Sequence, residues 1–194
     1  MSVTVERNDA LLIVDVQRDF LPGGKLGVPE GDAVVPVLNR YIAAARAKGM
    51  PIFASRDWHP QNHCSFKPHG GPWPEHCVAG TPGAAFAEGL QLPSDAVVID
   101  KATRTEADAY SAFSGTTLAA QLRSRGGRRL LVGGLATDYC VLNTVRDALR
   151  EGFEVILLED AIRAVNVNPG DGDRAQREML ERGALAATMQ ELAA

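Results

Sequence analysis

Asp15, Lys101 and Cys140 are far apart in the chain but together carry the side chains needed for nucleophilic catalysis by a thiol. Cys140 follows an apolar run at residues 129–135 and begins a helix-like run at 141–150. A thiol in the first turn of a helix lies near unpaired backbone N–H groups, which we expect to lower its pKa. Asp15 could accept the thiol proton and later deliver it to a leaving amine, while Lys101 stabilises the thiolate.

A second group of polar side chains lies in one stretch rich in glycine and proline, residues 56–83. Asp57 and His59 are two apart, so on extended backbone their side chains point the same way. His76 comes later in the same stretch, and two histidines with one carboxylate suit zinc, iron or manganese. His63 is a candidate further ligand or a partner of a ligand, whereas we interpret His69 as an ordinary loop residue.

Aromatic residues are only 6% of the chain, so their positions in loops are informative. Phe20 and Trp73 lie in two long loops, residues 17–31 and 56–83, and Tyr110 follows the Lys101 strand. We expect them to wall a flat, apolar pocket. Gly133 and Gly134, at a strand end, permit the backbone angles that an oxyanion-binding turn requires.

Alternating strand-length and helix-length segments indicate how these residues are positioned. We predict strands at residues 10–14, 51–55, 96–100, 129–135, 154–158 and 184–188, and helices at 32–49, 116–125, 141–150 and 174–182. Continuously apolar strands alternating with helices are typical of a mostly parallel sheet covered on both faces, a three-layer α/β/α fold with six strands. Asp15, Asp57, Lys101 and Cys140 each follow one of the first four strands, and such sheets bind ligands at the carboxyl ends of their strands. Each residue alone has an ordinary structural explanation, but their common position favours catalysis.

The bulk composition sets the class of protein. A chain of 194 residues with 45% hydrophobic and 23% charged residues fits one domain, residues 1–194. A net charge of -4 without a basic cluster argues against nucleic acid, and no run of apolar residues is long enough for a membrane span. The three cysteines lack CxxC spacing, and the first residues do not resemble a signal peptide, so we expect a cytoplasmic protein without a disulfide framework.

With these residues assembled, the chain resembles the isochorismatase-like cysteine hydrolase family over nearly its whole length. The matching segments are Asp15-Val16-Gln17-Arg18-Asp19-Phe20, Asp57-Trp58-His59-Pro60 with His63, Trp73-Pro74-Glu75-His76-Cys77, Lys101-Ala102-Thr103, and Gly134-Leu135-Ala136-Thr137-Asp138-Tyr139-Cys140. The Asp, Lys and Cys segments define the superfamily. The two histidine-containing segments resemble its nicotinamidase branch.

The resemblance implies a role for each matching position. Cys140 would attack the carboxamide carbon of nicotinamide, Asp15 would be the general base and then the acid for departing ammonia, and Lys101 would complete the triad. A cis peptide bond at Leu135–Ala136 would direct the N–H groups of Ala136 and Cys140 at the oxyanion. Water would then hydrolyse the thioester to nicotinate.

The resemblance also implies the remaining site residues and partners. Asp57, His59 and His76 would bind one divalent metal ion that orients the pyridine ring, with waters or His63 completing its ligands. Zinc is our first expectation, with iron and manganese as alternatives. The side chains of Phe20 and Trp73 would enclose the ring, and Tyr110 and Ala136 would line the pocket.

The expected activity is hydrolysis of nicotinamide in NAD salvage, with pyrazinamide as a further substrate, by a monomer or a homo-oligomer that binds neither nucleic acid nor membrane. One alternative keeps the triad but acts on a ureido or maleamate substrate without a metal. The other is a scaffold without catalysis, which the presence of all three triad residues disfavours.

Overall fold

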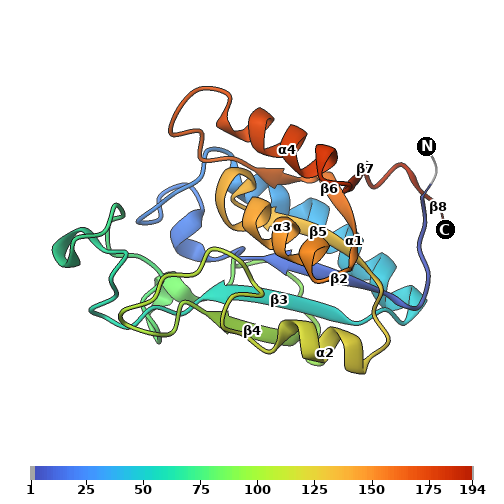
Figure 1. Ribbon diagram of the computed structural model, residues 1–194, viewed down its shortest axis with the longest axis horizontal. Helices are drawn as coiled ribbons and strands as arrows, with labels where there is room; N and C mark the ends of the chain where they lie inside the picture. Colours follow the sequence, from blue (N-terminus) through green and yellow to red (C-terminus); the bar gives the residue numbers. More distant parts are fainter. Residues whose placement is uncertain (1–2, 194) are drawn as a thin grey trace.

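The computed structural model describes residues 3–193, and its centre is a sheet of six parallel strands (Figure 1). The strands are β2 (Asp9–Val14), β3 (Ile52–Asp57), β4 (Val97–Lys101), β5 (Arg129–Leu135), β6 (Glu154–Arg163) and β7 (Leu185–Ala187). Their order is β4-β3-β2-β5-β6-β7 and every neighbouring pair is parallel, which confirms the predicted α/β fold. The strand order reverses between β2 and β5, and at such a point the following loops diverge and leave a crevice for ligands.

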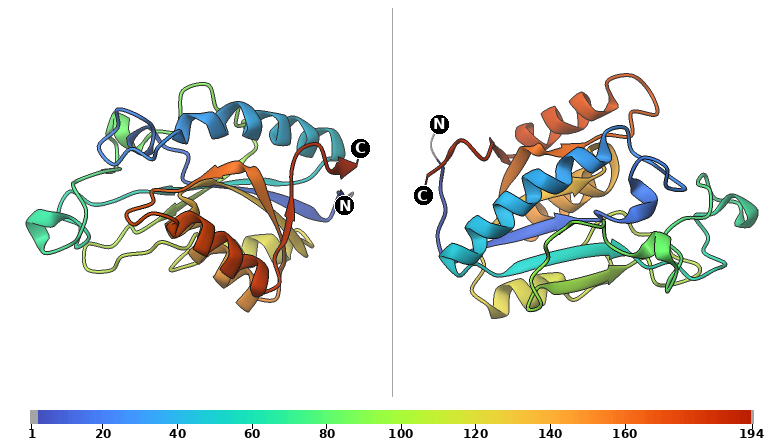
Figure 2. Two further views of the ribbon diagram at one scale, coloured as in Figure 1. Left: turned by 90° about the horizontal axis from the view of Figure 1, so that it is seen from above. Right: turned by 180° about the vertical axis from the view of Figure 1, so that it is seen from behind.

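In the described part of the chain, four α-helices cover the two faces of this sheet, as Figure 2 shows for their placement. The helix α1 (Val34–Lys48) lies on one face, where Leu38 and Ile42 pack with Leu11 and Ile13 of β2. On the opposite face lie α2 (Leu118–Ser124), α3 (Leu142–Arg150) and α4 (Asp171–Glu181), which pack over a core that includes Leu12 of β2. Successive residues of β2 thus contribute to opposite cores, and this is why the strand is apolar from Ala10 to Val14.

Several element boundaries differ from those expected. The strand predicted at 154–158 continues to Arg163, and the helix predicted at 174–182 begins earlier, at Asp171. The helix predicted from residue 141 is preceded by a π-helical turn at Thr137–Val141, so Cys140 lies in that turn and not in a regular helix. The end of α1 is as predicted, because Gly49 takes the left-handed conformation with φ 68°.

One further pair of strands was not predicted: β1 (Val3–Thr4) and β8 (Leu192–Ala193) form a separate parallel ladder. Two-residue strands are too short to show a periodic pattern, which explains the omission. The ladder lies at the end of the molecule opposite the long loops, which are on the left in Figure 1.

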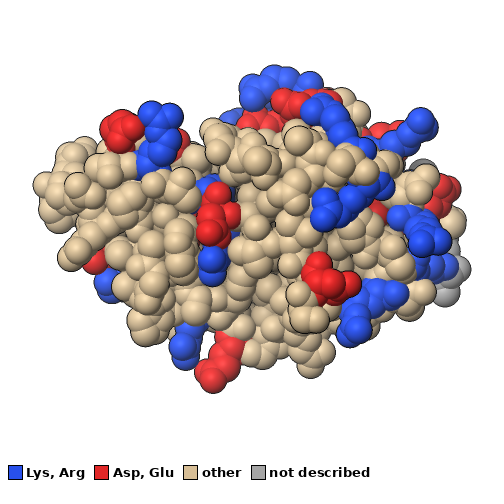
Figure 3. All heavy atoms as spheres, turned by 90° about the horizontal axis from the view of Figure 1, so that it is seen from below, with Lys and Arg blue, Asp and Glu red and all other residues tan. Residues whose placement is uncertain are grey.

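The long loops at the carboxyl ends of the strands are built around short 3₁₀ turns, at Arg18–Phe20, Gly31–Ala33, Lys67–His69 and Pro82–Ala84. The face seen in Figure 3 carries basic and acidic side chains close to one another and no extended field of one sign. Within residues 3–193, no helix has the length and apolarity required to cross a bilayer.

Candidate active site

The strands deliver the predicted catalytic side chains to one edge of the sheet. Asp15 directly follows β2, Asp57 and Lys101 are the last residues of β3 and β4 and are register partners, and Cys140 follows β5. Asp15 has a positive φ of 49°, a conformation that is sparsely populated outside glycine and that is concentrated at functional sites. All four residues are at least nine-tenths buried, so the structure brings the predicted group together away from bulk water.

The Lys101 ammonium is the centre of this group. Its Nζ lies 2.9 Å from Asp15 Oδ2 and 3.6 Å from Cys140 Sγ. It also donates to Asp57 Oδ1 at 2.5 Å and to the Ala109 carbonyl at 3.0 Å. One buried cation is therefore shared by two buried carboxylates, one beside the thiol and one in the predicted metal site.

The two oxygens of Asp15 have different surroundings. Oδ1 accepts a hydrogen bond from Ser55 Oγ at 2.7 Å. Oδ2 forms the ion pair with Lys101 and has no hydrogen-bond partner among the described residues. Since a buried acceptor is normally satisfied, this oxygen is the one available for the Cys140 proton.

Burial changes the expected protonation of the thiol. It raises the pKa of Cys140 well above its usual value, and Lys101 lowers it only in part. The prediction of a lowered thiol pKa from a helix N-terminus is therefore wrong, because burial of the thiol outweighs the effect of the nearby Lys101 cation. Burial also raises the pKa of Asp15, with Lys101 opposing it, whereas Asp15 and Asp57 hold the pKa of Lys101 high against the effect of burial. The resting pair is a protonated thiol beside a carboxylate of raised basicity.

Asp57, His59 and His76 form the second predicted group and lie together as expected. The Nε2 atoms of His59 and His76 are each 4.0 Å from Asp57 Oδ2, and one ligand atom from each of the three residues lies within 4.8 Å of the others. Each histidine uses Nδ1 against a backbone carbonyl, His59 with His76 O at 3.0 Å and His76 with Pro74 O at 2.8 Å. Such outer hydrogen bonds fix ring orientation in metal sites, and here they turn both Nε2 atoms toward Asp57.

The charge state of these groups also suits a metal. Burial lowers the pKa of His59 to about 4, and burial lowers that of His76 as well. Neutral imidazoles are the form that coordinates a metal. Burial opposes ionisation of Asp57, but Lys101 and His59 together hold its pKa below the usual value. Two neutral histidines and one carboxylate therefore fit a zinc, iron or manganese ion.

His63 lies beside this set without joining it. Its ring is 4.4 Å from that of His59, but its Nδ1 pairs with Ser65 Oγ at 2.7 Å and its Nε2 with Ala107 O at 3.2 Å. His63 also forms a possible ligand set with His59 and the exposed Asp108. Whether it is a direct ligand stays a prediction. His69 lies in a surface turn, as expected of an ordinary loop residue.

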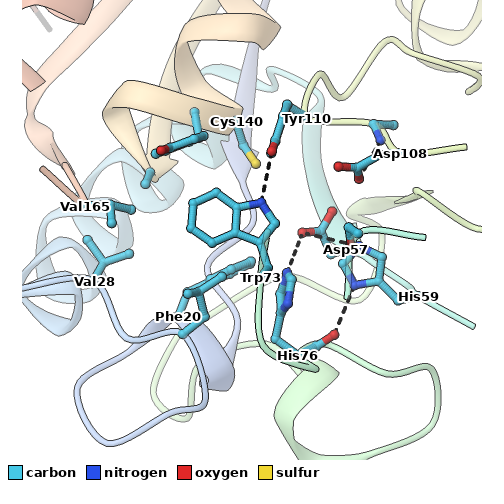
Figure 4. A pocket seen from close by; sticks show the side chains of 15 residues that line it. Phe20, Val28, Asp57, His59, Trp73, His76, Asp108, Tyr110, Cys140 and Val165 are labelled. Atoms are coloured by element: carbon cyan, nitrogen blue, oxygen red, sulfur yellow. Dashed lines mark hydrogen bonds and ion pairs between the residues drawn. The ribbon is translucent and has the colours of Figure 1, made fainter. Parts of the chain in front are cut away.

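Cys140 and the three residues of the second group line one pocket that encloses about 480 Å³, its mouth included (Figure 4). The predicted aromatic residues all line it, and Trp73 Nε1 donates to Tyr110 Oη at 2.9 Å. Figure 4 shows Cys140 and the Asp57, His59 and His76 group facing the same space from different sides. Phe20 and Ala136 complete the predicted lining, so every residue assigned to substrate binding is present there.

The turn that carries Cys140 has the expected backbone. The Leu135–Ala136 peptide bond is cis, and the Ala136 carbonyl accepts from the Tyr139 and Val141 amides, both at 3.1 Å. Gly134, with φ 125°, leaves no room for a side chain against Val14 of the neighbouring strand. The role of the Ala136 and Cys140 amides as oxyanion donors remains a prediction.

Part of the pocket wall and two residues that position the site were not predicted from the sequence. Val28, Tyr139 and Val165 line the pocket, and no periodicity marks loop residues of this kind. The fully buried Gln17 holds Asp57 by two hydrogen bonds of 2.8 Å, from its own Nε2 to the Asp57 carbonyl and from the Asp57 amide to its Oε1. The contact of Ser55 with Asp15 was not predicted because Ser55 lies within a strand. A single hydroxyl in an apolar run could nevertheless have marked Ser55 as a polar partner of the site.

Known proteins resemble this chain over nearly its whole length. The family model described as the isochorismatase domain matches residues 9–191. The chain is 41% identical to the nicotinamidase of Escherichia coli, an alignment that covers 93% of this chain and 94% of the relative. Among solved structures, the pyrazinamidase of Pyrococcus horikoshii in complex with zinc is 52% identical, with a TM-score of 0.90 and coverage of 94% and 99%. PnC1 of L. infantum in complex with nicotinate is 40% identical, with a TM-score of 0.90 and coverage of 100% and 99%.

Proposed function

This chain belongs to the isochorismatase family, and from that premise we propose that it is a nicotinamidase that hydrolyses nicotinamide to nicotinate and ammonia. One observation carries the proposal: Cys140, which is buried with Asp15 and Lys101, lines the same aromatic pocket as the Asp57–His59–His76 group. The first group can break a carboxamide bond. The second group, together with the aromatic side chains that line the pocket, would bind a flat heteroaromatic substrate.

Catalysis would begin when the carboxamide carbon lies against Cys140. Sγ attacks this carbon while its proton passes to Asp15 Oδ2, the oxygen without a hydrogen-bond donor. The carbonyl oxygen becomes an oxyanion that the Ala136 and Cys140 amides would stabilise. Asp15 then returns the proton to the amide nitrogen, the C–N bond breaks, and ammonia leaves a thioester on Cys140.

Water would complete the reaction. Asp15 removes a proton from a water molecule, the resulting hydroxide attacks the thioester carbon, and the C–S bond breaks to give nicotinic acid, which releases its proton to solvent as nicotinate. The thiolate regains its proton from Asp15. Lys101 remains a cation throughout, since two carboxylates hold its pKa high, and it keeps both the thiolate and Asp15 in place.

The metal group would act on binding and orientation. Asp57, His59 and His76 would hold the ion, and the bound ion would supply a Lewis acid for the ring nitrogen of the substrate. We propose zinc first, since a relative of this chain was solved with zinc, and iron or manganese suits the same atoms. Pyrazinamide, with the same carboxamide on a similar ring, would also be hydrolysed. A role in NAD salvage and a cytoplasmic location belong to the same proposal.

Ammonia release from nicotinamide tests this function directly. We expect turnover by the wild-type protein, loss of turnover with a chelator and recovery with zinc. Cys140→Ala should lower the rate by about a thousandfold or more, because the nucleophile is removed. Cys64→Ala is the matched control, because Cys64 is not among the pocket residues. Unchanged ammonia release by Cys140→Ala would refute the mechanism. Full activity without any metal would refute the role of the metal group, and no ammonia release from nicotinamide by the zinc-loaded wild-type protein would favour the ureido or maleamate alternative.

A further inference from the structure

Asp19 is a buried carboxylate that belongs to neither the triad nor the metal group. It is only 6% exposed, although no lysine or arginine forms an ion pair with it in the described part of the chain. A buried charge without a cation must be satisfied by hydrogen bonds. Its Oδ2 accepts from the Cys77 amide at 2.7 Å, and Oδ1 lies 3.4 Å from the Lys25 amide.

The bond to Cys77 fixes the backbone beside a metal ligand. Cys77 has a positive φ of 46°, an unfavourable conformation for a residue with a side chain. It directly follows His76, so the orientation of this peptide decides where the His76 ring can point. Phe20, the neighbour of Asp19, packs against that ring with centroids 5.6 Å apart. Asp19 and Phe20 thus hold His76 from its backbone and from its ring.

Asp19 also orders the loop that it belongs to. Its own carbonyl accepts from the Leu26 amide at 2.9 Å, and Leu26 lines the pocket. One residue therefore joins the loop that carries Phe20 and Leu26 to the loop that carries His76.

Gly83, from a third segment, leaves the space that the Asp19 carboxylate occupies. A methyl group on Gly83 would overlap both carboxylate oxygens of Asp19, and no other group would lie closer to it. The backbone of Gly83 does not need a positive φ, and the three atoms nearest to an added methyl group all belong to the Asp19 carboxylate. The Gly83→Ala substitution is therefore a way to displace Asp19 without changing it.

We propose that Asp19 is a positioning residue for the metal site, which holds the His76–Cys77 turn so that His76 Nε2 faces Asp57. This inference rests on the metal site of the proposed function. Its consequence is that the acceptor on Asp19, and not only its bulk, sets metal affinity. Asn keeps an oxygen acceptor at the same place, whereas Ala leaves the strained Cys77 amide without one.

The test is the zinc affinity of purified full-length variants, measured by competition with a chromophoric chelator. We expect Asp19→Ala to bind zinc about 10–100-fold more weakly, the range found when outer partners of metal ligands are removed. Asp19→Asn should retain most of the affinity. Gly83→Ala should weaken zinc binding, and the Asp19→Ala/Gly83→Ala double variant should be no weaker than Asp19→Ala alone, because the second change then has no carboxylate to displace. Asp32→Ala, an exposed acidic residue near the same loop, is the control and should bind as the wild type does.

A second readout separates positioning from loss of fold. In metal-free protein, the rate at which iodoacetamide alkylates Cys140, followed by mass spectrometry of its peptide, reports the triad. It should stay within about twofold of wild type in all variants, since no hydrogen bond of Asp19 reaches the triad. Equal zinc affinity of wild type and Asp19→Ala, or additive losses in the double variant, would overturn the proposed role of Asp19. Either result would leave the proposed metal site untouched. A wild-type protein that binds no zinc would overturn the proposed metal site as well.

Discussion

Removing the Lys101 charge should expose how strongly the two carboxylates depend on it. In Lys101→Met, Asp15 and Asp57 would keep their buried positions but lose a cation at 2.9 and 2.5 Å. Breaking a buried ion pair by removing one partner costs about 3–5 kcal/mol. We therefore expect the free energy of unfolding of the metal-free protein to fall by about that amount near pH 7, and catalysis to be lost.

The pH dependence of this loss follows from linkage. Without the cation, burial would raise the pKa values of both carboxylates in the folded state above their unfolded values near 3.9. The folded variant then binds more protons than its unfolded chain, so its stability rises as the pH falls. The difference from wild type should be smaller at about pH 5 than at about pH 7, where both carboxylates must stay ionised without a partner.

Urea unfolding of chelator-treated protein at both pH values measures the effect. Asp15→Asn in the Lys101→Met background should restore part of the stability at about pH 7, because one buried charge is removed with its partner. Lys48→Met, an exposed lysine at the end of α1, is the control and should change stability by less than about 0.5 kcal/mol. If Lys101→Met were as stable as wild type at about pH 7, or if its loss were the same at both pH values, the shared-cation description would be wrong.

Three further substitutions test separate contacts. Ser55→Ala removes the hydrogen-bond donor to Asp15 Oδ1. Burial raises the pKa of Asp15 and this hydrogen bond lowers it, so the acid limb of kcat/KM for nicotinamide should move to higher pH in the variant. Ser55→Thr keeps the hydroxyl and should leave the acid limb in place. Trp73→Phe keeps an aromatic wall but loses the bond to Tyr110, and should raise KM about 2–10-fold with little change in kcat, the cost of one hydrogen bond; an unchanged KM would contradict this. Glu178 accepts hydrogen bonds from Arg146 and Arg182, and these bonds lower its pKa to about 2. Ionised Glu178 therefore stabilises the fold at pH values above its unfolded pKa near 4.3, and this stabilisation is lost as the pH falls toward 2. Glu178→Gln should therefore cost up to about 1 kcal/mol in urea unfolding at pH 7 and less at about pH 3, and an equal cost at both would argue against the ion pairs.

The parts of the site that the sequence predicted are those tied to strand ends. Asp15, Asp57, Lys101 and Cys140 each end or follow a strand, and parallel strands bring their carboxyl ends to one edge, so convergence could be expected without coordinates. The six strands were recognisable because their apolar runs are continuous. The resemblance of the motifs then supplied the family, which the isochorismatase-domain match confirms.

The parts that could not be predicted depend on how loops fold against each other. Val165 and Tyr139 reach the pocket only through the path of irregular backbone, which no period describes. The predicted direction of the Cys140 pKa shift was wrong because that direction depends on burial, and burial is a property of the assembled core rather than of the local sequence. Asp19 was visible within a matching motif, but its partner Cys77 is 58 residues away, so the contact could not be inferred from spacing.

The sharing of Lys101 between Asp15 and Asp57 also bears on how such a site could change during evolution. A lineage that lost its metal could not simply replace Asp57 by a neutral residue, since Lys101 would then have one carboxylate in place of two and would draw closer to Asp15. The base and the metal ligand are thus tied to a single charge, although only the metal ligand can be lost while the triad is kept. Among homologous sequences that retain the residues at positions 15 and 101, we expect a neutral residue at 57 to occur with a new anion or altered packing beside the lysine.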